Sequence, residues 1–134
     1  MLYRLVYRSR CALPAESQSE AVAALVARAK AANAAIGVTG ALLLAEGMFL
    51  QAIEGPLVAI EALFERICSD LRHRDVQLLE FAPAETRLFA DWSMELVEPD
   101  ADALTRLPLA ASTATGEATL ELLKAQLPKL RPAA

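Results

Sequence analysis

Cysteine and histidine are scarce in this chain of 134 residues, which has two cysteines and one histidine. Cys11 and Cys68 do not have the spacing of metal ligands, and a single pair of cysteines does not make a disulfide framework. We therefore expect no metal site. Cysteines without such a pattern are typical of a reducing compartment, so the sequence predicts a cytoplasmic protein.

The chain also lacks an excess of basic residues and a long apolar run. Its net charge is −4, whereas nucleic-acid-binding domains are usually basic. The longest segment without charge, residues 31–45, is interrupted by Asn33, Gly37 and Gly40 and is too short to span a bilayer. The N-terminal residues enter a strand pattern directly, without the pattern of a signal peptide. We expect neither a nucleic-acid partner nor a membrane partner.

Apolar residues make up 55% of the chain, which is enough for one globular domain with its own core. Periodicity and turn residues predict a strand at 2–9 and a helix from the capping box 17–20 to about residue 33. A hairpin of strands 38–45 and 47–55 should follow. The next elements are a helix with Pro56 in its first position that ends near residues 70–73, and strands at 76–81 and 93–97. This order, β-α-β-β-α-β plus a fifth strand, predicts an α+β, ferredoxin-like fold. Both helices should cover one sheet face, because crossover connections are right-handed.

The other sheet face also has an apolar pattern, made by Val6, Met48, Leu50, Ala52 and either Leu42 or Leu43. Such a face must be covered. Leucines recur at helical spacing near the C-terminus, so we expect a helix that packs there through Leu120, Leu123, Leu127 and Leu130. Residues 99–116, rich in Ala, Ser and Thr, would connect it. The sequence thus predicts a core unit over 1–98 and an extension over 99–134 that is not an independent domain.

Gln51 is expected in the middle of a strand, on the same face as Phe49 and Ile53. A buried amide must replace its hydrogen bonds to water or cost about 1–3 kcal/mol. Taken alone, Gln51 would most simply be a core residue bonded to backbone. The same face is expected to collect further polar or polarisable side chains, namely Tyr7, Ser9, Asn33, Trp92 and Met94. Their convergence favours a planar heteroaromatic ligand with its own donors and acceptors, held between the two helices.

Five short runs make the chain resemble the BLUF domains, blue-light sensors that use FAD. The runs are residues 2–9, 33–40, 49–55, 70–73 and 87–94, with the sequences LYRLVYRS, NAAIGVTG, FLQAIEG, DLRH and RLFADWSM. They occur in the family's order and span residues 2–97. The remainder is similar to the C-terminal helical extension of short, single-domain members. The resemblance implies a non-covalently bound flavin, normally FAD, between the two helices.

The resemblance also implies roles for individual residues. Tyr7 matches the photoactive tyrosine, which gives an electron and a proton to the excited flavin, and Gln51 matches the glutamine between that tyrosine and the flavin. Asn33 matches the asparagine that bonds the flavin's pyrimidine edge. Light would leave the Gln51 amide rotated or tautomerised, which shifts the absorption spectrum without net reaction.

A second group of residues is implied to bind the flavin or to adjust its response. The expected flavin contacts, besides Asn33 and Gln51, are Ser9, Arg28, Lys30, Asp70, Arg72 and His73. Arg72 matches a basic residue near the flavin's polar edge or phosphate, although which of Arg28, Lys30 and Arg72 meets the phosphates stays open. Trp92 and Met94 match the switch residues that respond to Gln51. Ala29 and Ala32 replace polar residues of other members, which bears on the spectrum and recovery rate and not on flavin binding.

Three classes of function are compatible with these residues. The first is a blue-light photoreceptor that signals to a separate, unidentified protein through the C-terminal helix and the sheet face beneath it, as a homo-oligomer, most simply a dimer. The second is a thermal flavoenzyme, which would need a catalytic acid or base beside the flavin; His73 is the only histidine. The third is a ligand-free interaction module. The joint pattern favours the photoreceptor, with FAD or alternatively FMN as cofactor, and no enzymatic activity.

Overall fold

The protein is described by a computed structural model that covers residues 2–97 and 115–126. Its five-stranded sheet has the strand order β4-β1-β3-β2-β5. The strands are β1 (Leu2–Cys11), β2 (Thr39–Ala45), β3 (Met48–Pro56), β4 (His73–Pro83) and β5 (Glu95–Val97). Neighbouring strands are antiparallel, except that β5 runs parallel to β2. The predicted α+β, ferredoxin-like order with a fifth strand is confirmed.

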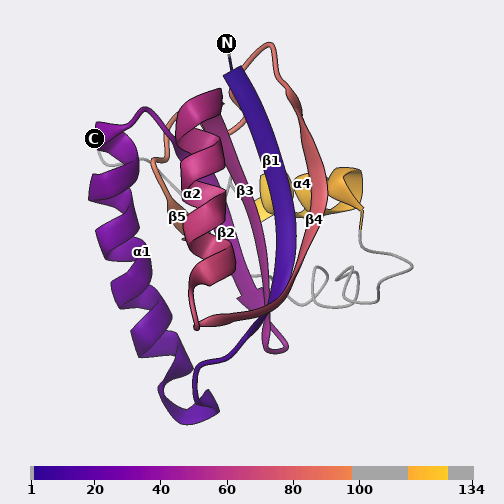
Figure 1. The fold of residues 1–134 in the computed structure, drawn as a ribbon. Helices are drawn as coiled ribbons and strands as arrows, with labels where there is room; N and C mark the ends of the chain where they lie inside the picture. The colour runs from indigo at the N-terminus through magenta and orange to yellow at the C-terminus, as the bar shows by residue number, and fades with distance from the viewer. Residues whose placement is uncertain (1, 98–114, 127–134) are drawn as a thin grey trace.

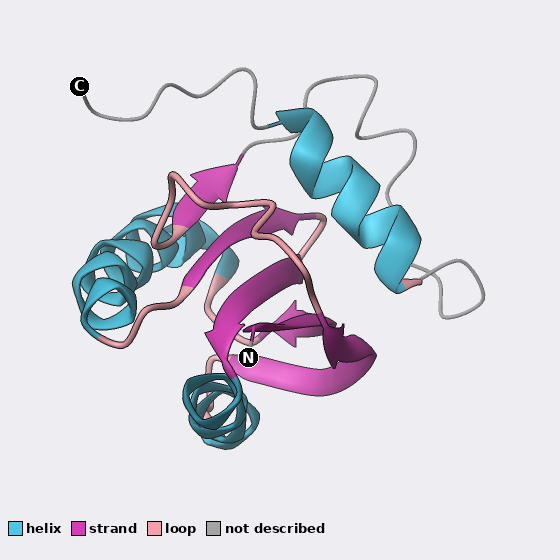
Figure 2. Ribbon diagram, turned by 90° about the horizontal axis from the view of Figure 1, so that it is seen from above, coloured by secondary structure: helices cyan, strands magenta, loops and turns pink. Residues whose placement is uncertain are grey.

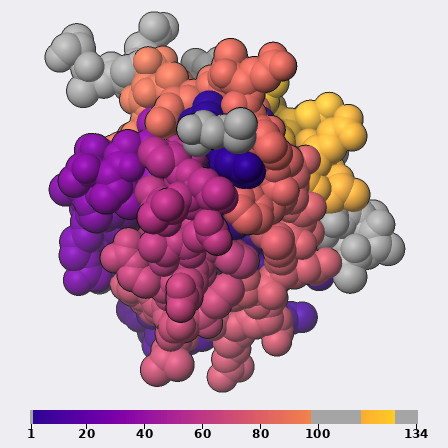
Figure 3. Space-filling model, turned by 45° about the horizontal axis from the view of Figure 1, so that its top comes forward, coloured from indigo at the N-terminus to yellow at the C-terminus, as the bar shows by residue number. Residues whose placement is uncertain are grey.

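The sheet separates two layers of helix. Helices α1 (Gln18–Ala35) and α2 (Leu57–Ser69) cover one face, and a single helical turn, η1 (Ala15–Ser17), precedes α1. Helix α4 (Gly116–Gln126) lies on the opposite face (Figures 1 and 2). In the space-filling view α2 lies between α1 and β4 (Figure 3). Among the described residues, no helix combines the length and the apolar character needed to cross a membrane.

Two apolar clusters form the core, one on each side of the sheet. Alternation along β1 sends Leu5 and Tyr7 toward α1 and α2, where they join the first cluster, and Val6 toward α4, where it joins the second. The second cluster contains Leu43 from β2, which settles the alternative between Leu42 and Leu43. Leu42 lies on the side of α1 and α2.

The β2–β3 hairpin fixes the register of the central strands. Its turn residues, Glu46 and Gly47, both have positive φ angles, 53° and 73°, as a two-residue type I′ turn requires. The resulting pairing sets Leu42 opposite Gln51, and β1 sets Tyr7 opposite Gln51 on the other side. The predicted hairpin around Glu46-Gly47 is confirmed.

Three expectations about the ends of elements are wrong. Ser17 precedes α1, but its side chain makes no capping hydrogen bond, because Ser17 ends η1 and its backbone N–H bonds to Pro14 O. Pro56 is not the first residue of α2: it ends β3, still paired with Leu2, and stands just before the helix. Strand β4 starts at His73, earlier than predicted, because the chain turns directly from α2 into pairing with the end of β1.

Helix α4 packs on the predicted sheet face, and of the predicted stripe Leu123 is buried there and Leu120 packs at its margin. Its buried positions are Gly116, Thr119, Leu122, Leu123 and Gln126, a helical i, i+3, i+4, i+7 series that begins at Thr119. Leu120 is only half-buried at the margin of the interface. Leu127, Leu130 and most of the connector lie outside the described residues, and the division into a 1–98 unit and an extension stays a prediction.

Candidate functional site

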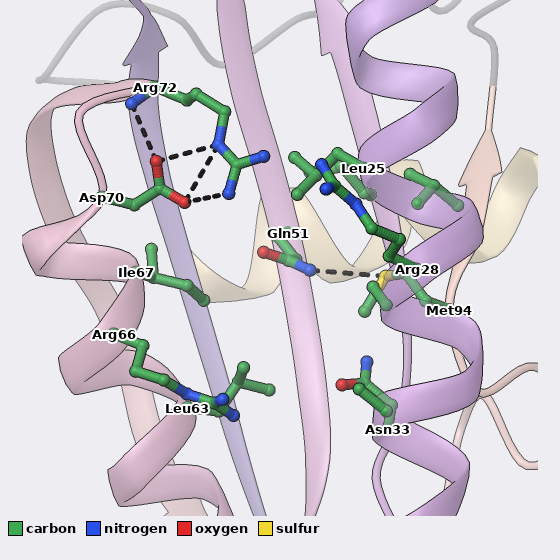
Figure 4. Close-up of a pocket in the computed structure, with 14 residues that line it drawn as sticks. Leu25, Arg28, Asn33, Gln51, Leu63, Arg66, Ile67, Asp70, Arg72 and Met94 are labelled. Atoms are coloured by element: carbon green, nitrogen blue, oxygen red, sulfur yellow. Dashed lines mark hydrogen bonds and ion pairs between the residues drawn. The ribbon is translucent and has the colours of Figure 1, made fainter.

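A pocket of about 390 Å³ opens between α1 and α2 (Figure 4). Its walls are mainly apolar, with Leu25 and Val26 on α1 and Leu63 and Ile67 on α2. The remaining lining residues are Arg28, Ala29, Ala32, Asn33, Leu42, Gln51, Arg66, Asp70, Arg72 and Met94. A concave, largely apolar site with a few polar groups is typical of a small-molecule or cofactor site.

Gln51 lies at the base of this pocket and links two buried side chains. The Tyr7 hydroxyl donates a hydrogen bond to Gln51 Oε1, and Gln51 Nε2 donates to Met94 Sδ at 3.3 Å. Tyr7 is fully buried and Gln51 is 8% exposed. The cross-strand pairing of Tyr7 with Gln51 explains their contact, because directly paired residues point to the same face. The amide therefore connects β1 to the segment before β5.

The phenol of Tyr7 is held in its protonated form. Burial raises the pKa of Tyr7 far above its ordinary value, and the charges of Asp70 and Cys68 raise the pKa further. Aromatic rings pack around it: Phe64 lies at 5.8 Å and His73 at 5.9 Å between ring centroids. The protonated hydroxyl can donate to Gln51 Oε1, as it does here, and could accept from Nε2 if the amide turned.

Asn33 lies at the C-terminal end of α1, where its backbone and its side chain have different hydrogen-bond partners. Its backbone carbonyl accepts from Ile36 and Val38 as the helix ends. Its side-chain Nδ2 donates to Ser93 O at 3.0 Å. Asn33 Oδ1 accepts no hydrogen bond from any described residue, and the side chain lines the pocket (Figure 4). This acceptor and the second Nε2 hydrogen of Gln51 are available to a bound molecule.

Asp70 and Arg72 form a compact pair at the pocket's edge. Arg72 donates to the Asp70 carboxylate through its backbone N–H and its Nε, both at 2.9 Å (Figure 4). Hydrogen bonding to Arg72 lowers the pKa of Asp70, and the same bonds raise the pKa of Arg72. Much of the Arg72 donor capacity is therefore used within the protein.

Arg28 and Arg66 line the same pocket without such a partner. Neither guanidinium makes an ion pair or hydrogen bond within the described part of the chain, and both residues are exposed. Arg28 is a residue predicted from the sequence, whereas Arg66 is not. The available signal was helical spacing, since Arg66 lies three residues after Leu63 and four before Asp70, both of which line the pocket.

Besides Tyr7, four predicted site residues do not line the pocket. Ser9 and His73 hydrogen-bond to each other at 2.8 Å between Oγ and Nδ1, beside Tyr7. Lys30 pairs with Glu95 at 2.9 Å. Trp92 packs against the cluster on the α4 side, so the expectation that it converges on the cleft with Met94 is wrong. Alternation failed there because residues 84–94 are not a regular strand; Trp92 bonds through its backbone O to Gly40 N.

The chemical capacity of the site follows from these contacts. The pocket offers apolar walls on α1 and α2, an acceptor at Asn33, an amide at Gln51 that can donate or accept, and a protonated phenol one hydrogen bond away. A planar ring with its own donors and acceptors fits this set, since it would satisfy the polar groups that the protein leaves available. No three His, Cys, Asp or Glu side chains in the described ranges come close enough together to hold a metal ion.

Comparison with known proteins agrees with this geometry. The photoactivated adenylate cyclase subunit beta of Euglena gracilis is 33% identical over 107 residues, which cover 80% of this chain and 12% of that protein. The chain therefore spans only a small part of the curated relatives it matches. The dark-state structure of BlrB, described as a BLUF protein, has a TM-score of 0.77 at 32% identity and covers 96% of this chain and 97% of its own.

A solved structure of BlsA in its photo-activated state has a TM-score of 0.84 and covers 100% of this chain and 99% of its own. At 24% identity this likeness shows the fold alone. Residues 2–95 match the family model described as sensors of blue-light using FAD, BLUF. The chain belongs to the BLUF family of flavin-binding blue-light sensors.

Proposed function

We propose that this blue-light sensor responds through the hydrogen-bond chain from Tyr7 through Gln51 to Met94. The observation that carries the proposal is the buried Gln51 amide, which accepts from Tyr7 and donates to Met94 while it borders the pocket. When bound there, a flavin supplies blue-light absorption and a strong excited-state oxidant. Every other part of the response belongs to the protein's own side chains.

Tyr7 is the donor of both an electron and a proton. A buried phenol with a raised pKa holds its proton in the dark, but loss of an electron makes the phenol strongly acidic. The hydroxyl proton then moves along its existing hydrogen bond to Gln51 Oε1. When the electron and the proton return to Tyr7, no net oxidation remains, and the amide is left rotated or tautomerised with a different bond to Met94.

The flavin is held by Asn33 and Gln51 at its polar edge and by the leucine and isoleucine side chains of α1 and α2 on its faces. We favour Arg28 and Arg66 as the residues that bind the phosphates. The guanidinium of Arg72 already donates to Asp70, and Lys30 already pairs with Glu95. A guanidinium suits a phosphate by its forked geometry. FAD is the natural ligand on this proposal, with FMN as a weaker substitute; a solved structure of Klebsiella pneumoniae BlrP1 is described as containing FMN.

The chain acts as a sensor and not as an enzyme, on this proposal, and passes its signal to a separate protein in the cytoplasm. The two cysteines are free, which suits a reducing compartment. The output surface is formed by α4 and the sheet face beneath it, and the functional unit, residues 1–98 with the extension 99–134, works as a homodimer.

The test is the visible absorption spectrum of the purified protein before and after blue light. Gln51→Leu is expected to bind flavin and to lose the light-induced red shift, because leucine can neither accept from Tyr7 nor donate to Met94. Tyr7→Phe should lose the shift as well. A normal, reversible shift in Gln51→Leu would contradict the mechanism.

The wild-type protein separates the three functional classes in the same experiment. A small red shift that recovers in darkness supports the photoreceptor. A flavin that bleaches and oxidises added substrate in the dark would support the thermal enzyme. A colourless protein that takes up no added FAD would support the interaction module.

A further inference from the structure

The Glu54 carboxylate is fully buried and accepts hydrogen bonds from four donors. Its Oε1 accepts from Thr39 Oγ1 at 3.0 Å and from the backbone N–H of Phe89 at 2.7 Å. Its Oε2 accepts from Arg4 Nε at 3.2 Å and from the backbone N–H of Leu88 at 3.0 Å. Burial of a carboxylate is costly unless such partners satisfy it. The arrangement therefore needs all of these donors in place.

The donors belong to β1, to β2 and to the segment between β4 and β5, which Arg87 also ties to Thr39 Oγ1 at 2.8 Å and to Gly37 O at 2.7 Å. Arg4 lies on β1, Thr39 on β2 and Glu54 on β3, whereas Leu88 and Phe89 belong to the irregular segment between β4 and β5. The start of that segment is tied down further, since Arg4 Nη2 donates to Thr86 O at 2.7 Å. Glu54 thus fastens the start of the β4–β5 segment to three central strands.

The end of the same segment reaches the pocket. Ser93 O accepts from Asn33, and Met94 Sδ accepts from Gln51. Gly40 is needed at this approach, because a Cβ there would lie 3.2 Å from Met94 Cε and 2.2 Å from Ala52 O. Met94 is therefore held in a confined position, and its distance along the chain from the Leu88–Phe89 anchor is short.

The middle of the segment lies on the other side of the sheet. Phe89 is fully buried in the cluster that contains Leu122 and Leu123 of α4, and Trp92 packs against that cluster. One short stretch of chain therefore reaches the cluster that contains α4 residues through Phe89 and Trp92, and the pocket through Met94. The Glu54 carboxylate, which binds the Leu88 and Phe89 N–H groups, is one anchor of this stretch, and Arg87 is another.

We propose that Glu54 is a positioning residue for the light response: it anchors Leu88 and Phe89 so that Met94 stays against Gln51 and the α4 side of the segment moves with it. The inference depends on the proposed role of the Gln51–Met94 bond. Glu54 lies three positions from Gln51 in β3 and points to the opposite sheet face.

Glu54→Gln tests this inference with little change in shape. An amide has one oxygen and an NH₂ group that cannot accept, so two of the four donors lose their partner and the Leu88–Phe89 anchor loosens. Flavin binding and the red shift should persist. Recovery in darkness should become roughly tenfold faster, the change expected when one charge-assisted hydrogen bond no longer restrains the transition. In the dark, hydrogen exchange should rise in residues 86–94 and in α4.

Two comparisons separate positioning from general destabilisation. Glu95→Gln makes the same chemical change one residue after Met94, at a partly exposed ion pair with Lys30, and should leave the recovery rate within about twofold, because surface ion pairs contribute little. In the Met94→Ala background, Glu54→Gln should add no further acceleration, because Glu54 acts through Met94. If Glu54→Gln does not fold, Thr39→Val removes one donor to Glu54 together with the acceptor of Arg87 Nη1, and should give a smaller acceleration with the same dependence on Met94.

Several results would overturn the proposal. They are an unchanged recovery rate in the folded variant, an acceleration that is fully additive with Met94→Ala, or unchanged dark exchange in residues 86–94. The exchange measurement needs no light and tests the anchor even if the photochemistry fails. A wild-type protein without a reversible shift would instead contradict the proposed function while the exchange result still reports on Glu54.

Discussion

The Gln51 amide has one orientation that suits both of its neighbours. Tyr7, protonated because its pKa is raised, donates to Oε1, and the Met94 sulfur, which carries no hydrogen, can only accept from Nε2. A half-turn of the amide would set Oε1 against a sulfur that cannot donate. The two orientations therefore differ by roughly one weak hydrogen bond, about 1 kcal/mol, a gap small enough for light to populate the second orientation and for darkness to reverse it.

Asn33→Ala should weaken flavin retention. The substitution removes the Oδ1 acceptor at the pocket and the bond to Ser93 O. A net loss of about 1 kcal/mol per hydrogen bond corresponds to a three- to tenfold rise in the dissociation constant. Fluorescence titration of the apoprotein with FAD measures it, with the exposed neighbour substitution Ala34→Ser as control. Equal affinity in Asn33→Ala and wild type would contradict the role given to Asn33.

His73 makes stability sensitive to mild acid. Burial is the main cause that lowers the pKa of His73. The charge of Asp70 raises this pKa to a smaller extent, and the charge of Arg72 lowers it further. A histidine with a lowered native pKa binds its proton more readily when unfolded. The stability that neutral His73 contributes is therefore fully present when the pH is above the unfolded-state pKa near 6.5. It is lost as the pH falls through the lower native pKa.

The melting temperature of the wild type should accordingly fall between pH 7.5 and pH 5. His73 is the only histidine in the chain, so it accounts for most of the slope in this range. His73→Gln keeps a side chain that can bond Ser9 and should flatten the profile. A wild-type profile that is already flat, or a variant with an unchanged slope, would contradict this assignment.

At the scale of elements, the β2–β3 hairpin helps to set the site because it holds Gln51 opposite Leu42, while β1 pairs Tyr7 with Gln51 on the other side. Gly47 has a φ of 73°, and a Cβ at Gly47 would meet no atom within 4 Å. Gly47→Ala therefore tests backbone strain alone and should cost about 1 kcal/mol of unfolding free energy. Glu46→Asn, at a φ of 53°, should add a few tenths of a kcal/mol, because asparagine tolerates this region.

Urea unfolding measures both hairpin variants, and the flavin spectrum serves as the control. Because the turn does not line the pocket, the spectrum should be unchanged in each. Equal stability of Gly47→Ala and wild type would show that the turn relaxes to another type.

Sequence periodicity predicts most of these elements because regular strands obey strict alternation. It places Tyr7 and Gln51 on one face and Val6 on the other, as the structure has them. It fails for Trp92, because the β4–β5 segment follows side-chain anchors at Glu54 and not a strand ladder. Arg66 is missed for a different reason: an exposed arginine on a helix looks the same whether or not a pocket lies beside it.

At the scale of the whole molecule, the sheet divides the pocket side from the side that we propose for the output. The pocket lies between α1 and α2. Helix α4 lies on the opposite face of the sheet from these two helices (Figure 2). The β4–β5 segment contributes side chains to both, Met94 on one side and Phe89 on the other. On the proposed output route, the docking of α4 decides how far a change at Met94 can spread.

Thr119 limits that docking. It is fully buried against the sheet, and its Oγ1 has no hydrogen-bond partner in the part of the chain that is described. Thr119→Val keeps the shape and removes the unpaired hydroxyl, and the two residues have similar helix propensity. The variant should gain about 1 kcal/mol of stability, or about 3 °C in melting temperature.

Thr115→Val is the matched control on the same helix. Its Oγ1 accepts from Ala118 N at 3.0 Å, so the same change removes a helix cap and should cost about 1 kcal/mol. If α4 carries the signal, Thr119→Val should also reduce the light-induced increase in hydrogen exchange of residues 116–126 while the flavin red shift stays normal. A loss of stability in Thr119→Val would mean that the hydroxyl has a partner, and an unchanged exchange response would mean that the signal leaves the sheet by another surface.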